Sequence, residues 1–134
     1  MAKTLAIVFG AVFVLVGILG FLANPIVGME GLFQTDTLHD LVHLLFGIIL
    51  LVVAFTAPAR SAAWLKILGI VYLVLAVLGF LTISDGGELL GLVLMNTADH
   101  WLHVILGVAL LLAGMAGRGS RSGSGSMPMS SPSM

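Results

Sequence analysis

The sequence predicts an all-α membrane protein with four transmembrane helices, formed by a parallel helical hairpin that occurs twice. Three observations lead to this prediction. The 134 residues are 60% hydrophobic and only 8% charged, whereas soluble domains carry roughly a quarter charged residues. Four apolar stretches are each long enough to cross a hydrocarbon core of about 30 Å. Finally, the stretch Thr35–Gly47 recurs, with the same spacing of polar and glycine positions, as Met95–Gly107.

The first helix is expected at Leu5–Ala23, which contains no charged residue. A basic residue at Lys3 and a small residue at Ala23 also suit a cleaved signal peptide. However, Gly20 recurs as Gly79, in an apolar stretch that cannot be a signal. This internal match favours an uncleaved helix.

The other three helices are expected at Leu38–Phe55, Ala62–Ile83 and Ala98–Met115. Thr35, Asp36 or Thr37 is expected to cap the start of the second helix, because these residue types accept hydrogen bonds from the free N–H groups of a first turn. Between the third and fourth helices, Leu89–Met95 is apolar. We expect it to form a short interfacial helix or a re-entrant segment.

We interpret residues 1–116 as one transmembrane domain, with 4–57 and 62–116 as the two copies of the hairpin. Residues 117–134 are rich in Gly, Ser, Pro and Met and cannot bury a core. They are predicted to be a disordered cytoplasmic tail.

The charged residues predict how the chain lies in the membrane. The basic residues are at the two termini and after the second helix: Lys3, Arg60, Lys66, Arg118 and Arg121. The acidic residues are near the opposite ends of the helices: Glu30, Asp36, Asp40, Asp85, Glu88 and Asp99. Because cytoplasmic segments carry the excess of Lys and Arg, we predict a multi-pass protein of the inner (cytoplasmic) membrane with both termini in the cytoplasm.

Composition also excludes several function classes. The chain has no cysteine, so disulfides, thiolate metal sites, iron–sulfur clusters and attached c-type haem are excluded. A net charge of −1 without a basic block argues against a nucleic-acid partner. No nucleophile–base pair, phosphate loop or paired catalytic carboxylates is apparent, so we do not expect an enzyme.

The recurring stretch places one polar stripe on each of two helices. At about 100° per residue, positions 36, 39, 40 and 43 share a face of the second helix, and positions 96, 99, 100 and 103 share a face of the fourth. His43 and His103 are the deepest members. Gly47 and Gly107 follow one turn further along the same faces and would allow another helix or a flat ligand to approach closely.

Several hypotheses account for the two stripes. In the first, the histidines and aspartates form a polar layer between helices, and the protein is a non-enzymatic structural or accessory subunit, either self-associated or in a larger membrane complex. In the second, the protein binds a divalent metal or b-type haem and acts in redox chemistry or transport. A third is proton handling or pH sensing by the histidines. The candidate metal ligands are His39, His43, His100, His103, Asp36, Asp40 and Asp99, and the candidate haem ligands are His43 and His103.

The stretch GLFQTDTLHDLVHLLFGIILLV resembles the signature of a family of uncharacterised bacterial four-helix membrane proteins, which has a Gly-Leu-Phe lead, an Asn or Asp, and a His-Asn-x-x-His-Leu-x-x-Gly run. This chain departs from the signature at Asp40, where Asn is usual. The resemblance implies a small integral membrane protein and no particular activity. The matching residues are Gly31, Leu32, Phe33, Asp36, His39, His43, Leu44 and Gly47.

Overall fold

The computed structural model describes residues 1–83 and 85–117, so the predicted tail lies outside the described residues except for Gly117. The described chain is mostly helical, which confirms the predicted fold class. The elements in order are α1 (Ala2–Gly20), α2 (Thr37–Thr56), the 3₁₀ helix η1 (Pro58–Arg60), α3 (Ser61–Thr82), β1 (Gly87–Leu89), β2 (Val93–Met95) and α4 (Thr97–Ala116).

Four helices within the described ranges are long and apolar enough to cross a membrane, so the chain is a multi-pass membrane protein. Their outward faces carry exposed large apolar side chains, for example Val8, Ile48, Val74 and Ile105. Such faces are stable only against lipid or another apolar surface. The identity of the membrane and the direction of insertion stay predictions from the sequence.

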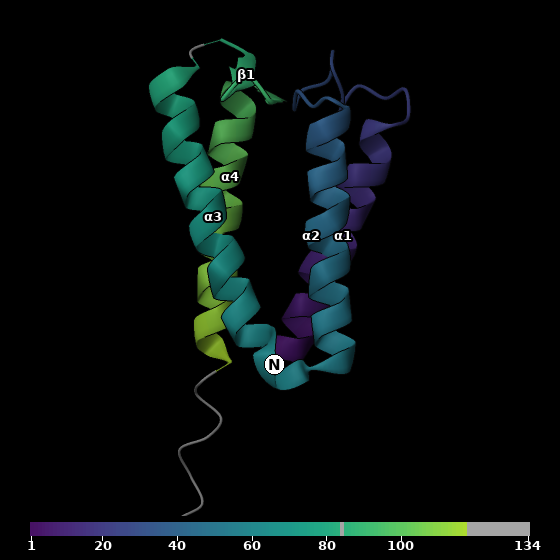
Figure 1. Ribbon diagram of the computed structural model, residues 1–134, viewed down its shortest axis with the longest axis vertical. Helices are drawn as coiled ribbons and strands as arrows, with labels where there is room; N and C mark the ends of the chain where they lie inside the picture. Colours follow the sequence, from purple (N-terminus) through teal and green to yellow (C-terminus); the bar gives the residue numbers. More distant parts are fainter. Residues whose placement is uncertain (84, 118–134) are drawn as a thin grey trace, which may run out of the picture.

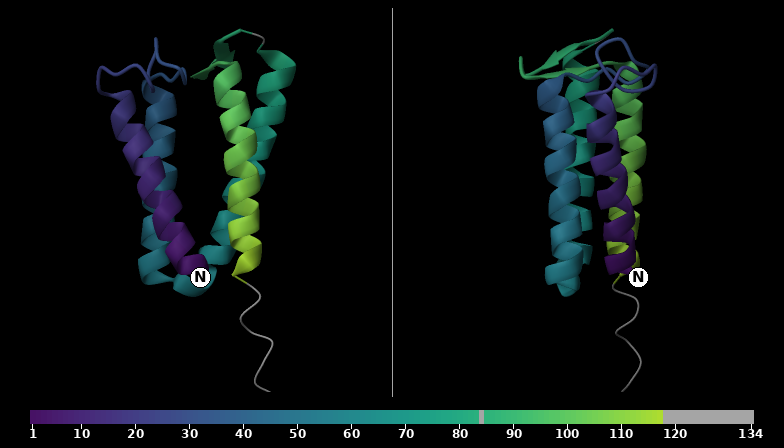
Figure 2. Two further views of the ribbon diagram at one scale, coloured as in Figure 1. Left: turned by 180° about the vertical axis from the view of Figure 1, so that it is seen from behind. Right: turned by 90° about the vertical axis from the view of Figure 1, so that its right-hand side faces the viewer.

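The four helices form two hairpins, α1–α2 and α3–α4, which together make a V (Figures 1 and 2). The hairpins converge at the end of the bundle that holds the N-terminus and η1. They separate toward the opposite end, which carries β1, β2 and the segment between α1 and α2. We call this wider end the loop end. That the two hairpins arose by duplication stays a prediction.

In each hairpin, a glycine of the second helix lies against the backbone of the first helix. A Cβ at Gly47 would lie 2.7 Å from the backbone nitrogen of Val14 and 2.8 Å from the carbonyl oxygen of Gly10. A Cβ at Gly107 would lie 3.0 Å from the carbonyl oxygen of Gly69. The sequence predicted that another helix or a flat ligand would approach these glycines. The structure places a helix against each of them, and that helix belongs to the same hairpin.

The starts and ends of the helices have local causes. The side chain of Asp36 accepts a hydrogen bond from the N–H of His39 (2.8 Å) and caps α2. At the other hairpin Asn96 caps α4 and forms a capping box with Asp99. Helix α1 ends three residues earlier than expected, because the Asn24 side chain donates to the Leu19 carbonyl (2.8 Å) and turns the chain into the loop.

The expectation of a helical or re-entrant Leu89–Met95 is wrong. The segment instead forms the antiparallel pair β1–β2, with Gly87 opposite Met95 and Leu89 opposite Val93. Three residues, Leu90–Leu92, connect the paired residues Leu89 and Val93, and two of them, Leu90 (56°) and Gly91 (69°), have positive φ, which is common in short hairpin connections. Leu89 and Met95 are buried together, so alternate side chains cover the loop end of the bundle.

The main core lies between the hairpins, on the narrow side of the V. It includes Phe13 of α1, Leu50 of α2, Tyr72 of α3 and Leu110 of α4, all at most 1% exposed. The rings of Phe13 and Tyr72 stack with a centroid separation of 5.2 Å. This stacked pair lies beneath the buried histidines.

Candidate functional site

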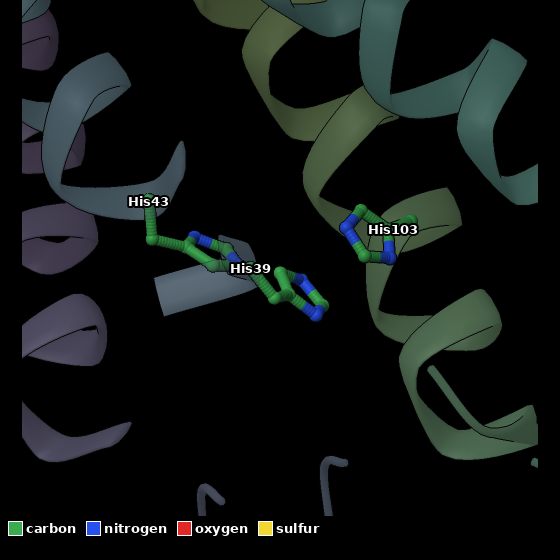
Figure 3. A group of neighbouring side chains, drawn as sticks. All are labelled: His39, His43 and His103. Atoms are coloured by element: carbon green, nitrogen blue, oxygen red, sulfur yellow. The ribbon is translucent and has the colours of Figure 1, made fainter. Parts of the chain in front are cut away.

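Three histidines converge between α2 and α4 above this core (Figure 3). His39 and His43 come from successive turns of α2, and His103 comes from α4. Each offers a ring nitrogen, and these three atoms lie within 4.8 Å of one another. The three side chains are buried, at 4%, 6% and 4% exposure. We call them the histidine trio.

The three rings form a triangle whose shortest side joins the two histidines of α2. Their centroids are separated by 4.9 Å for His39–His43, 5.9 Å for His39–His103 and 6.4 Å for His43–His103. The i,i+4 spacing on α2 brings the first two together because such residues lie on one helix face. The approach of the third is a tertiary contact between the two hairpins.

Each ring of the trio is held through its Nδ1 atom. His39 Nδ1 lies 2.8 Å from the carbonyl oxygen of Leu94, and His103 Nδ1 lies 2.7 Å from the carbonyl oxygen of Asp99. Because a carbonyl only accepts, both Nδ1 atoms carry the hydrogen, and in the neutral rings Nε2 keeps its lone pair. His43 Nδ1 lies 3.3 Å from the hydroxyl of Tyr72. Metal-binding histidines are commonly oriented in this way.

The carboxylates of Asp36 and Asp99 support the trio without joining it. Asp36 Oδ2 accepts a hydrogen bond from the N–H of Leu94 (3.2 Å), the residue whose carbonyl holds His39. Asp99 Oδ2 accepts from the N–H groups of Gln34 (3.0 Å) and Asn96 (2.8 Å). Each aspartate thus accepts a hydrogen bond from a backbone N–H at the start of its own helix and another from a backbone N–H of the other hairpin.

The remaining two predicted ligands lie away from the trio, inside their own hairpins. A Cβ at Gly20 of α1 would overlap the carboxylate of Asp40, and a Cβ at Gly79 of α3 would overlap the imidazole of His100. The His100 ring also packs edge-on against Phe80, at 5.2 Å between centroids. The residues of each predicted stripe therefore face in two directions. Some face the other hairpin, and the rest face the other helix of their own hairpin.

Two cavities flank the trio. One, of about 260 Å³, lies between α2 and α3 under the strands, and all three histidines line it. The other, of about 230 Å³, lies between α1 and α4, and His43 and His103 line it. Tyr72, which also lines the first cavity, was missed by sequence reasoning. It is the single tyrosine of the chain, and a lone hydroxyl within an apolar helix was the available signal.

The structure does not fit the haem alternative. A porphyrin held by His43 and His103 would lie midway between their rings. His39 is 4.9 Å and 5.9 Å from these rings, so it occupies the space beside the axis that the disc requires. The adjoining cavities, at about 260 and 230 Å³, are also smaller than the usual 300–1,000 Å³ of cofactor sites.

Comparisons with known proteins cover nearly all of the described chain. The family model described as "Domain of unknown function (DUF4383)" matches residues 3–116. No curated protein and no solved structure shows significant similarity to the sequence.

Proposed function

The chain belongs to the DUF4383 family, and from the geometry of its buried site we propose that it is a membrane protein that binds a divalent transition-metal ion through His39, His43 and His103. Membership agrees with the family resemblance seen in the sequence. The family description states no activity, so the proposal is based on the site.

The observation that carries the proposal is the orientation of the trio. Three buried imidazoles have ring nitrogens within 4.8 Å of one another, and in two of them a carbonyl acceptor at Nδ1 leaves Nε2 as the coordinating atom. Zinc holds imidazole nitrogens at about 2.0–2.1 Å, so the nitrogens of a tetrahedral site lie roughly 3.3 Å apart. Binding an ion would therefore require the rings to rotate so that these nitrogens move closer together.

The ligand set favours zinc among the candidate ions. Neutral imidazoles suit zinc, copper, iron and nickel, whereas magnesium, calcium and manganese prefer oxygen ligands. Three protein ligands with a fourth position open are typical of zinc sites that exchange a ligand. Since α2 gives two ligands and α4 gives one, the ion would join the two hairpins.

The structural role is a second candidate, and a specific observation favours it. The hydrogen bonds from Gln34 to Asp99 and from Leu94 to Asp36 already connect the hairpins at the loop end. In this role the histidines complete a polar layer in a non-enzymatic accessory subunit, and no ion is required. Metal analysis separates the two candidates.

The test is metal analysis and cobalt(II) titration of the detergent-purified protein, with cobalt as a coloured substitute for zinc. We expect about one ion per chain in the wild type and none in His39→Ala, His43→Ala or His103→Ala. His100→Ala is the matched control, because His100 is also a buried histidine of α4 but lies inside its own hairpin and away from the trio. A folded wild type that takes up neither ion overturns the proposal, and so does an equal loss in His100→Ala.

A further inference from the structure

The cavity between α2 and α3 adjoins the whole trio. All three histidines line it, together with apolar side chains from both hairpins and from β2, including Val42, Phe46, Val71, Leu75 and Val93. The second cavity is reached by only two of the histidines. An ion held by all three ligands would therefore adjoin the larger of these two cavities.

The ligands of an ion at this site would not neutralise its charge. Three neutral imidazoles leave a divalent ion with its full double charge, and an unpaired charge in an apolar environment is costly. Among the described residues, no carboxylate belongs to the ligand group. Both oxygens of Asp36 and the Oδ2 atom of Asp99 accept hydrogen bonds from backbone N–H groups. An anionic fourth ligand would lower this cost.

The walls of the cavity indicate what the anion is attached to. A volume of about 260 Å³ far exceeds the roughly 30 Å³ of a water molecule, and the lining is apolar apart from the histidines and Tyr72, so most of the cavity offers no hydrogen bonds to water. The size is also below the usual range for compact drug-sized ligands. It suits a headgroup and the first part of an alkyl chain, with the rest of the chain in the adjoining lipid.

Tyr72 supplies a second contact for the same headgroup. When Nε2 of His43 binds an ion, Nδ1 must carry the hydrogen and donate to the tyrosine oxygen, 3.3 Å away. The hydroxyl hydrogen of Tyr72 is then free to donate to an oxygen in the cavity that this residue lines. A carboxylate has two oxygens, one for the ion and one for this hydroxyl.

We propose that the cavity between α2 and α3 binds a long-chain carboxylate from the membrane, whose headgroup completes the coordination of the ion held by the histidine trio. This inference rests on the proposed metal site. It adds the ligand class and assigns the ligand to one of the two cavities.

The test uses the cobalt-loaded protein in lipid nanodiscs, with the visible absorption of cobalt(II) as the readout of its coordination. Decanoate is the probe. Acetate has the carboxylate without the chain, and decanol has the chain without the carboxylate. We expect decanoate to change the spectrum at a concentration at least about tenfold lower than acetate, and decanol to leave it unchanged, because both the charge and the chain contribute to binding.

Two tryptophan variants test which of the two cavities binds the carboxylate. Leu75→Trp fills the cavity between α2 and α3, and Leu102→Trp fills the one between α1 and α4; neither residue is a proposed ligand. We expect Leu75→Trp to bind cobalt but to need at least about tenfold more decanoate, and Leu102→Trp to behave as wild type. If Leu75→Trp fails to fold, Val71→Phe takes its place.

The outcomes distinguish the two proposals. A cobalt-loaded wild type that does not respond to decanoate, or responds equally to acetate, overturns the ligand inference and leaves the metal site intact. A decanoate response that is lost in Leu102→Trp but kept in Leu75→Trp overturns the assignment to the larger cavity. A wild type that binds no cobalt overturns the metal site and the ligand inference together.

Discussion

The Asp99 side chain, in the first turn of α4, accepts a hydrogen bond at 3.0 Å from the backbone N–H of Gln34, which lies just before α2. A second bond runs in the opposite sense, from the N–H of Leu94 to the carboxylate of Asp36. The two hairpins are therefore connected at the end where their helices separate most (Figure 1). The same connection positions Leu94, whose carbonyl orients His39.

Replacing Asp99 by alanine should lower the stability of the bundle. The substitution removes the acceptor for two backbone N–H groups and half of the capping box of α4. Leaving buried donors without a partner costs about 1–3 kcal/mol. Thermal unfolding in detergent measures the effect. Glu88→Ala is the control, because Glu88 is exposed, and an equal loss in both variants would contradict the assigned role of Asp99.

Adding a methyl group at Gly47 or Gly107 should separate the helices of one hairpin. The new Cβ would lie 2.7 Å from Val14 atoms at the first site and from Leu73 Cγ at the second. Overpacking of this kind costs about 1–3 kcal/mol. Gly87→Ala is the matched control, since its Cβ would meet only an ordinary contact at 3.6 Å. Unchanged unfolding temperatures for Gly47→Ala and Gly107→Ala would show that the hairpins pack differently.

Tyr72→Phe should weaken metal binding without unfolding the protein. The change removes the hydroxyl that holds His43 Nδ1 but keeps the ring that stacks on Phe13. Loss of such an orienting partner typically lowers metal affinity 10–100-fold, so we expect about a tenfold weaker cobalt affinity. The cobalt titration described above, run beside a thermal melt, measures both quantities. A cobalt affinity equal to that of the wild type would show that the Tyr72 hydroxyl plays no part in metal binding.

Zinc should stabilise the wild-type fold, because its ligands come from both hairpins. An ion that binds only the folded state adds about 2.7 kcal/mol when its free concentration is 100 times the dissociation constant. We expect a higher unfolding temperature with zinc and its reversal by a chelator. His103→Ala keeps two ligands on α2 alone, so zinc should leave its unfolding temperature unchanged. An equal zinc effect in both proteins would mean that the ion binds elsewhere.

The direction of insertion can be measured with single cysteines, since the natural chain has none. Met29→Cys places a thiol at the loop end, and Ala59→Cys places one in η1; both positions are exposed. The distribution of basic residues predicts that an impermeant maleimide labels the first in intact cells and the second only after permeabilisation. The opposite labelling pattern would reverse the predicted topology.

Much of the fold could be predicted from the sequence because it depends on local features. The length and apolarity of the four helices and their capping residues are properties of short stretches, and the observed helices begin within a few residues of the expected positions. The β1–β2 hairpin was missed because a seven-residue apolar segment has no clear period. Its conformation depends on the positive φ at Leu90 and Gly91 and on burial of its alternate side chains over the bundle.

By itself, the sequence determined that the chain spans a membrane four times and that histidines and aspartates gather at the start of two helices. Only the tertiary structure decided which of them meet. Adjacent helix residues point about 100° apart, so the rotation of each helix about its own axis decides which of two adjacent side chains faces the centre of the bundle. This rotation is fixed by the close approach at Gly47 and Gly107, and the other side chain of each pair then faces its own hairpin. His39 thus joins His43 and His103, while His100 is directed against Gly79.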